Sequence, residues 1–254
     1  MKKMITILAV AMLLWGASAS ADTLDFLKPF WMQMMDGVSN TASGKIPENV
    51  TVTCTDERLM VEACGVLLEN DYSAEAHVYA VLKNTGSERL PIRSVQMTVI
   101  GANGNTLHKE DYVSYMPSVV EPGETMLVSE WMYDFVKEIG EVHSIQISVE
   151  TASRVNEKWK QLGDVRAWLD GDYLCVEFTN TTEKTLFGVI CAATVSDANG
   201  KILDMMMQSP YDTDDLGITQ GSSIVWRKQL EDAATLKIGT DAVCKAWAYW
   251  MEDL

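Results

Sequence analysis

The chain has 254 residues, with 20 basic and 36 acidic side chains, a formal net charge of −16 and 47% hydrophobic residues. That hydrophobic share excludes a disordered or low-complexity chain. The negative charge argues against nucleic-acid binding, which needs clustered Lys and Arg. Five cysteines are too few for a miniprotein built on disulfides, so we expect one or two ordinary globular domains.

Residues 1–21 have the pattern of a secretory signal peptide. Lys2 and Lys3 precede an apolar run from Met4 to Trp15, and Ala19-Ser20-Ala21 provides the small residues of a cleavage site. The run is shorter than the ~20 residues of a membrane helix, and no later segment is long and apolar enough for a membrane span. We expect cleavage after Ala21 and a secreted or extracytoplasmic protein; a retained N-terminal anchor is the alternative.

Residues 22–45 indicate a short amphipathic helix followed by a polar linker. The apolar residues recur at spacings of three and four, the period of one helix face: Leu24, Leu27, Trp31, Met34, Met35 and Val38. Two interpretations remain open. The helix docks on its own domain, or it presents Trp31, Met34 and Met35 to a partner.

The rest of the chain contains an internal repeat. Residues 84–107 match residues 180–203 without a gap, at nine of 24 positions, with Asn84 aligned to Asn180. Ala102-Asn103-Gly104 recurs as Ala198-Asn199-Gly200. The matches fall on turns and on apolar alternation, which indicates a tandem duplication of one module.

Each copy is predicted to consist of half-buried antiparallel strands. Val78, Ala80 and Leu82 alternate with their neighbours, as do Leu174, Val176 and Phe178 in the second copy. The two Asn-Gly pairs are hairpin signals, and further strands are expected at 126–131, 144–149, 224–226 and 245–251. Short strands with regular turns predict an all-β chain of two tandem immunoglobulin-like β-sandwich domains, residues 46–154 and 155–254.

The turn and hairpin motifs resemble those of the FxLYD-type domains of secreted bacterial proteins. The resemblance rests on the Asn-Thr turn, the Ala-Asn-Gly hairpin and Pro122-Gly123-Glu124, and it covers roughly residues 75–150 and 170–254. Of the Phe-x-Leu-Tyr-Asp signature itself, only Asp197 is present. The resemblance implies small immunoglobulin-like sandwiches, often in tandem and of uncertain function, without catalytic residues to transfer.

No motif in the chain supports catalysis. There is no His-Glu-x-x-His, no Gly-x-Ser-x-Gly and no Cys-x-x-Cys arrangement. We therefore assign no catalytic residue, no cofactor and no metal ligand, and we expect that the protein is not an enzyme. An enzyme with a site hidden at the domain interface is the weakest hypothesis.

Metal handling is the alternative function. The run Met205-Met206-Met207 offers thioethers of the kind that bind Cu(I), although methionine is also an ordinary packing residue. Acidic loops with Asp170 and Asp172, and with Asp212, Asp214 and Asp215, offer calcium ligands, against the simpler interpretation of solvated loops.

The cysteines and the aromatic residues provide the remaining candidates. A disulfide between Cys191 and Cys244 is one candidate among the five cysteines, and five buried thiols are the alternative. Trp247 and Tyr249 point to one face of the last strand, where they would form either a partner-contact platform or part of a core or interface. The leading hypothesis is a secreted, non-catalytic binding or spacer protein whose sandwich surfaces meet a protein or glycan partner.

Overall fold

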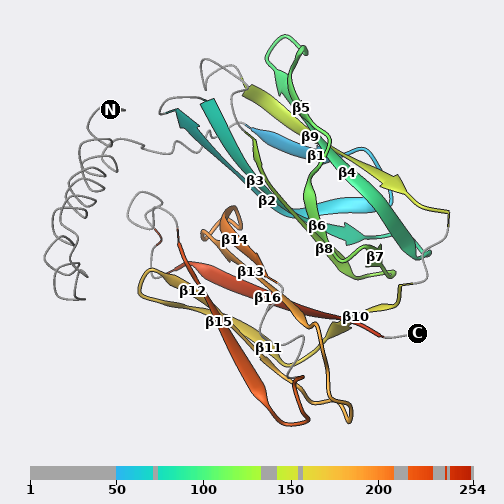
Figure 1. Ribbon diagram of the computed structural model, residues 1–254. Helices are drawn as coiled ribbons and strands as arrows, with labels where there is room; N and C mark the ends of the chain where they lie inside the picture. Colours follow the sequence, from blue (N-terminus) through green and yellow to red (C-terminus); the bar gives the residue numbers. More distant parts are fainter. Residues whose placement is uncertain are drawn as a thin grey trace, which may run out of the picture. The chain divides into compact units, whose positions relative to one another are not determined.

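The computed structural model describes residues 50–70, 74–132, 142–153, 157–208, 217–230, 238 and 241–252 (Figure 1). All regular structure in these residues is β, which confirms the predicted all-β class. Within the same residues, no helix has the length and apolarity that a membrane crossing requires. The predicted signal peptide, the predicted helix with Trp31, Met34 and Met35, and the boundary between residues 154 and 155 lie outside the described residues.

The N-terminal half forms two sheets. Sheet 1 has the strand order β1 (Thr51–Cys54), β9 (Val142–Thr151), β4 (Leu90–Gly101) and β5 (Thr106–Glu110), with β7 (Val119–Val120) also paired to β4. Sheet 2 has the order β2 (Leu59–Asn70), β3 (Ala74–Asn84), β8 (Thr125–Met132) and β6 (Ser114–Met116). All pairs are antiparallel except β1 with β9, which is parallel.

The C-terminal half repeats this arrangement. Sheet 3 has the order β10 (Trp159–Leu162), β16 (Val243–Met251), β13 (Ile190–Ser196) and β14 (Ile202–Gln208). Sheet 4 has the order β11 (Val165–Asp170), β12 (Tyr173–Thr179) and β15 (Ser223–Gln229). Both halves belong to one compact unit, Ser43–Leu254.

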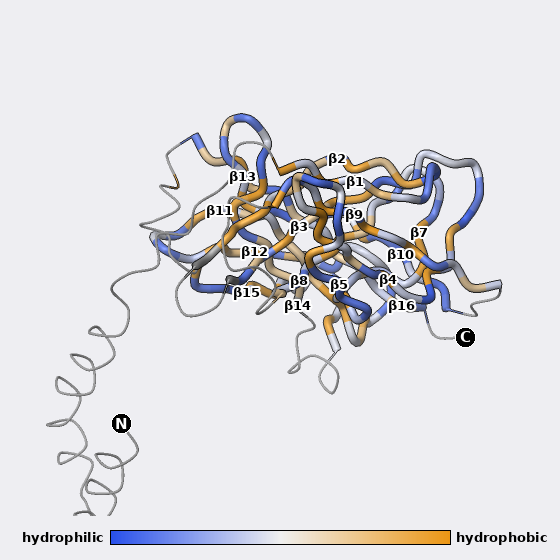
Figure 2. Tube along the Cα trace, turned by 90° about the horizontal axis from the view of Figure 1, so that it is seen from above, coloured by the Kyte–Doolittle hydropathy of each residue, from blue (hydrophilic) through white to orange (hydrophobic). Residues whose placement is uncertain are grey.

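Each pair of sheets encloses its own hydrophobic core, as in a β-sandwich. Between sheets 1 and 2, alternate residues of β3 and β4 are buried, among them Val78, Leu82 and Met97. Between sheets 3 and 4 the corresponding residues include Val176 and Phe178. Hydrophobic stretches lie along the strands, and hydrophilic residues gather in the connections (Figure 2). The period of two in the sequence therefore positions these side chains as predicted.

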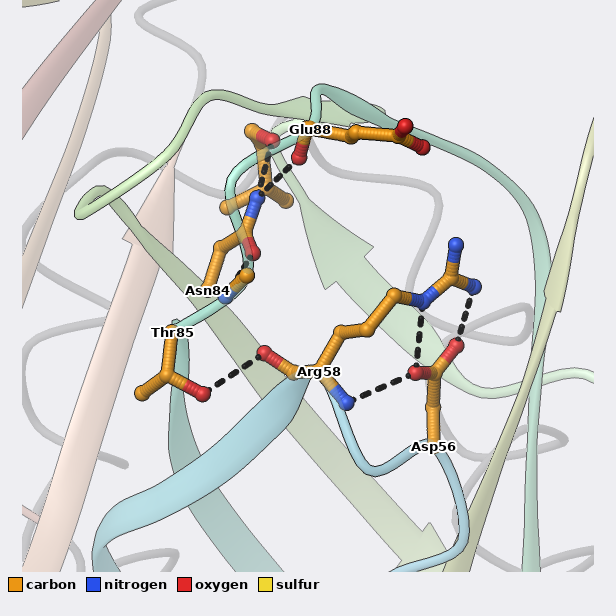
Figure 3. A network of polar contacts seen from close by, with 7 residues as sticks. Asp56, Arg58, Asn84, Thr85 and Glu88 are labelled. Carbon is orange, nitrogen blue, oxygen red and sulfur yellow. Dashed lines mark hydrogen bonds and ion pairs between the residues drawn. The ribbon is translucent and has the colours of Figure 1, made fainter.

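A buried asparagine organises one turn in each half. Asn84 ends β3, and its side-chain amide donates to the carbonyl oxygens of Glu88 and Val120 at 2.9 and 3.0 Å (Figure 3). Asn180, 96 positions later (180 − 84), donates in the same way to Lys184 and Ile218 at 2.8 and 2.6 Å. Both residues are 0% exposed. The repeated motif is thus a repeated set of hydrogen bonds.

The predicted hairpins are confirmed. Gly104 lies between β4 and β5 with φ of 76°, and Gly200 lies between β13 and β14 with φ of 82°. These values fall in the left-handed region, which glycine adopts without steric cost. The two Asn-Gly pairs therefore end one strand and start the next, as the sequence indicates.

Glu252 joins three segments near the end of the described chain. Its carboxylate accepts from Lys160 at 2.9 Å and from Lys184 at 3.0 Å, and its backbone N–H donates to the Lys158 carbonyl oxygen. The hydrogen bonds from Lys160 and Lys184 lower the pKa of Glu252 to about 2. Because this folded-state pKa lies below the ordinary value of 4.5, the bonds stabilise the protein above about pH 4.5. The stabilisation is lost as the pH falls through about 2.

We expect Glu252→Gln to lower the melting temperature at pH 7, because both lysines lose their charged partner. The decrease should be slight, because the lysine side chains are about half exposed and solvent screens the interaction. The difference from the wild type should shrink below pH 4.5 and vanish near pH 2, where the wild-type carboxylate is itself protonated. Thermal melts from pH 2 to 8 measure this dependence. If the difference in melting temperature stayed constant from pH 2 to 8, the lowered pKa of Glu252 would be contradicted.

Candidate functional site

A third hydrophobic cluster joins the two halves face to face. The face of sheet 2 that is turned away from its own core packs on the corresponding face of sheet 3. The buried members are Leu67, Tyr79, Val81 and Leu127 from sheet 2, and Ala192, Ile202, Met205, Trp247 and Tyr249 from sheet 3. Strand β3 is consequently buried on both faces, whereas its alternation had predicted a half-buried strand. The difference arises because the second half covers the face that would otherwise meet solvent.

Gly65 and Tyr249 show how closely the halves approach. A Cβ atom at Gly65 would lie 2.7 Å from the carbonyl carbon of Ile202 and closer still to its oxygen, so only glycine fits. The Tyr249 hydroxyl donates to the Thr125 carbonyl oxygen across the interface at 3.2 Å. Burial raises the pKa of this phenol above its ordinary value. The two sheets are therefore close-packed at these residues, as in a protein interior.

A groove of about 390 Å³ opens at one edge of this interface. We call it the Trp131 groove, and it is lined by Ser114, Ser129, Glu130, Trp131, Met205, Met206, Met207 and Lys228. Strands β6 and β8 supply one wall and strands β14 and β15 the other. Because β8 alternates, Ser129 and Trp131 point to the same face as the buried Leu127. The groove therefore continues the interface toward solvent.

Neighbouring groups hold the Trp131 ring in position. The His77 ring lies beside it with centroids 4.0 Å apart and an interplanar angle of 43°. The indole N–H donates to Glu75 Oε2 at 2.9 Å. Trp131 nevertheless remains 38% exposed, so part of its surface meets solvent.

A buried ion pair closes the far wall of the groove. The Lys228 ammonium lies 2.7 Å from Asp204 Oδ1 and donates to the Met205 carbonyl oxygen at 3.1 Å. Asp204 is 2% exposed, and within the described residues its other carboxylate oxygen has no hydrogen-bond partner. A charge this deeply buried needs its partner, so Lys228 is fixed in place by Asp204.

A second, smaller hollow lies at another part of the interface. Its volume is about 120 Å³, and Glu62, Ala63 and Val81 face Thr194, Val243 and Trp247 across it. Its lining has two carboxylates, Glu62 and Asp197, and one ammonium, Lys245. It is too small for more than a few waters or a short side chain, so the Trp131 groove is the better candidate for a ligand.

The partner-contact expectation for Trp247 and Tyr249 needs correction. These side chains are 8% and 0% exposed, because both are buried between sheets 2 and 3. They therefore hold the two halves together and present no surface to an outside partner. This is the interface alternative that the sequence left open. The other members of that predicted surface, Trp31, Met34 and Met35, lie outside the described residues.

The candidate disulfide pairs two cysteines that the structure keeps apart. Cys191 lies opposite Ala248 and Cys244 lies opposite Val195, so the two are several positions apart along neighbouring strands. All five cysteines lie in the described part of the chain, and all are free thiols. Burial raises the pKa of the thiols of Cys191 and Cys244. Raised pKa values make both weak nucleophiles.

The candidate metal ligands have different environments. Met205, Met206 and Met207 line the Trp131 groove, while Asp170 pairs with Arg227 at 3.0 Å. The loop of Asp212, Asp214 and Asp215 lies outside the described residues. Among the residues that are described, no group of three or more His, Cys, Asp or Glu side chains is arranged to hold a metal ion.

Glu130 and Trp131 were not among the site residues predicted from the sequence. A signal for them existed, since Leu127, Ser129 and Trp131 share one face of the predicted strand at 126–131. Their role became visible only when the structure brought β8 beside β14, some 75 residues later in the chain.

No protein-family model and no curated protein sequence matches the chain. Among solved structures, it is similar to the crystal structure of red sea bream transglutaminase, with 12% identity and a TM-score of 0.19 over 69% of this chain and 28% of that chain. It is also similar to the secreted serine protease VesC from Vibrio cholerae, with 9% identity and a TM-score of 0.19 over 85% of this chain and 48% of that chain. The chain thus spans less than half the length of either neighbour, and similarity at this level carries no argument about fold or function.

Proposed function

We propose that the chain is a secreted, non-catalytic binding protein made of two tandem immunoglobulin-like sandwiches that form one rigid body. The observation that carries the proposal is the buried contact between sheets 2 and 3, with Gly65 against Ile202 and Tyr249 bonded to Thr125. A flexible spacer would not need such a contact, whereas a binding protein gains affinity when its surface is held rigid. Secretion is supported by the signal-peptide pattern of residues 1–21.

The partner is proposed to be a polypeptide or a glycan that meets the groove side of this rigid body. Clefts between packed units are common binding sites, and a volume of about 390 Å³ is within the usual range for a ligand pocket. The exposed Trp131 offers a ring for packing on a side chain or a sugar.

Capture of partners by the chain spanning residues 22–254 tests this function. The folded chain and the same chain after denaturation are immobilised and exposed to cell-surface extract, culture medium and a glycan array. We expect one saturable partner that binds only the folded chain and that can be measured again with purified components. Absence of any saturable protein or glycan in all three sources would contradict a binding function.

One observation favours a second candidate, Cu(I) handling: three consecutive methionines line the same groove. Thioethers are suitable Cu(I) ligands, but residues 205 and 207 of a strand point to the opposite side from residue 206. At most two of them can therefore share an ion. Titration with Cu(I) against a chelator, compared between the wild type and Met205→Leu/Met207→Leu, decides this candidate; equal competition by both would reject it.

A further inference from the structure

Strand β14 is an apolar strand at the edge of a sheet. It is the last strand of sheet 3, and in the described part of the chain no further strand pairs with its outer side. Its sequence, Ile-Leu-Asp-Met-Met-Met-Gln, contains one charged residue, Asp204. The edge strand at the corresponding place in the first half, β5, includes the charged residues Lys109 and Glu110. An apolar edge strand can pair with a strand of another chain, and charged residues on the edge suppress this pairing.

The hairpin between β13 and β14 determines which backbone groups of β14 point outward. The Asp197 N–H donates to the Lys201 carbonyl oxygen at 2.9 Å and closes the hairpin. Along an antiparallel pair, residues bonded to the neighbouring strand alternate with residues whose N–H and C=O point away from it. Thr194 is three positions from Asp197 and lies opposite Met205. The N–H and C=O of Met205 therefore point outward, to the side where another strand could add.

Two side chains occupy these outward groups of Met205. Asp204 Oδ1 accepts the Met205 N–H at 2.7 Å, and the Lys228 ammonium donates to the Met205 carbonyl oxygen at 3.1 Å. The two side chains also pair with each other, with 2.7 Å between Lys228 Nζ and Asp204 Oδ1. Together they make both of the hydrogen bonds that a residue of an added strand would otherwise make with Met205.

Stability alone does not account for this ion pair. The Asp204 side chain is 3% exposed and the Lys228 side chain is 25% exposed. Removing water from two buried charges can cost as much as their attraction gains, and apolar residues of similar shape often stabilise a fold equally well or better. The pair is better explained by what it covers, which is the backbone of an apolar edge strand.

The first half has a related arrangement at the equivalent position. Glu130 lies opposite Val78 and Lys228 lies opposite Leu174, and these two partners are 96 positions apart (174 − 78). Glu130 accepts the backbone N–H of Ser114, the first residue of edge strand β6, at 3.0 Å. At this position both halves thus place a charged side chain on the backbone of an edge strand.

The Trp131 groove leaves the edge of β14 accessible. Met205, Met206 and Met207 all line the groove. Residue 206 of a strand points to the opposite face from residues 205 and 207, so a groove that meets all three runs along the strand edge. Lys228 lines the same groove and therefore lies where an incoming strand would make contact.

We propose that the Asp204–Lys228 pair closes the β14 edge and prevents a second copy of the chain from pairing with it. Without the pair, β14 of one copy would align antiparallel with β14 of another, and the outward groups of Met205 would bond to the added strand. This protection does not depend on what the chain binds.

Sedimentation velocity of the mature chain, residues 22–254, over a range of protein concentrations tests the proposal. In Asp204→Leu/Lys228→Met the new side chains keep the branching of Asp and the length of Lys, but they cannot form hydrogen bonds to Met205. We expect this variant to self-associate at least about tenfold more tightly than the wild type. Self-association equal to that of the wild type, with unchanged circular dichroism, would overturn the proposal.

Arg93→Met/Glu150→Leu is the matched control. Arg93 and Glu150 pair at 3.0 Å across β4 and β9, which are inner strands of sheet 1. This variant introduces the same two apolar side chains without opening a sheet edge, so it should associate like the wild type. If it associated as tightly as Asp204→Leu/Lys228→Met, the added apolar surface would be the cause, and the proposal would be rejected.

Hydrogen exchange of the wild type provides a second measurement that does not require the variant to fold. The outward N–H of an edge strand ordinarily exchanges quickly, because water reaches it. We expect the Met205 N–H to exchange at least about a hundredfold more slowly than in an unstructured peptide, because it is bonded to Asp204. Exchange at the rate of an unstructured peptide would mean that the edge is open, which is the opposite of what we propose.

Discussion

Gly65→Ala should lower the stability of the whole chain by about 3 kcal/mol, at the upper end of what overpacking usually costs. The added Cβ would lie 2.7 Å from the carbonyl carbon of Ile202, and the clashing atoms belong to the backbone of β14. A backbone cannot rotate away as a side chain can, so either β2 or β14 must shift. The shift would open the packing around Trp247 and Tyr249, which are 8% and 0% exposed in the intact interface.

Urea unfolding followed by circular dichroism and by tryptophan fluorescence measures this effect. In Gly65→Ala we expect the urea concentration at the midpoint of unfolding to fall below that of the wild type. The fluorescence change should occur at lower urea than the loss of β-structure, because the interface opens before the two cores unfold. Gly163→Ala is the matched control, since a Cβ at Gly163 would meet nothing within 4 Å. If Gly65→Ala unfolded in a single transition at the wild-type midpoint, the close contact between sheets 2 and 3 would be refuted.

Much of the fold could be predicted from the sequence because its signals are local. A period of two places Val95, Met97 and Val99 in the core, and the Asn-Gly pairs end their strands with Gly104 and Gly200 at positive φ. Local rules of this kind depend on neighbouring residues alone. They predicted the strands that became β4, β8, β9, β15 and β16, and they did so equally well in both halves.

The contact between the halves could not be predicted in this way. Cys175 lies 96 positions after Tyr79 (175 − 79), and their cross-strand neighbours are Trp168 and Gly65 respectively. Gly65 and Trp168 therefore occupy equivalent positions in the two halves. Gly65 leaves room for sheet 3 to cover sheet 2, whereas the Trp168 side chain lies on the outer face of sheet 4. Which of two equivalent faces is covered depends on pairing between distant surfaces. Neither periodicity nor turn chemistry reports that pairing.

The candidate site shows the same limit. The methionine run was visible in the sequence, but its meaning changed once Met205–Met207 met Trp131 across the edge of the interface. Trp247 and Tyr249 looked like a platform because an aromatic pair on one strand face has the same sequence pattern whether it is exposed or covered. A groove made by docking two surfaces leaves no local pattern, so Glu130 became a candidate only through its position.

Replacing either buried asparagine with alanine should lower the free energy of unfolding by about 3 kcal/mol. Each change leaves several buried backbone groups without a hydrogen-bond partner. In Asn84→Ala the carbonyl oxygens of Glu88 and Val120 lose their donor, and the Gly86 N–H loses its acceptor, Asn84 Oδ1 at 3.0 Å. In Asn180→Ala the Lys184 and Ile218 carbonyl oxygens lose theirs. Both side chains are 0% exposed, so water cannot replace them without opening the turn.

Chemical denaturation of the two variants, and of Asn84→Asp and Asn180→Asp, measures the effect. The aspartates keep the acceptor but lose both donors and add a buried charge, so they should cost at least as much as the alanines. Asn103→Ala and Asn199→Ala, at exposed turn positions of the same repeat, should stay within about 0.5 kcal/mol of the wild type. A costly Asn84→Ala beside a neutral Asn180→Ala would mean that only one turn depends on its asparagine. The common offset of 96 would then describe a resemblance of sequence without a shared structural role, and the proposal of two equivalent sandwiches would lose its main physical support.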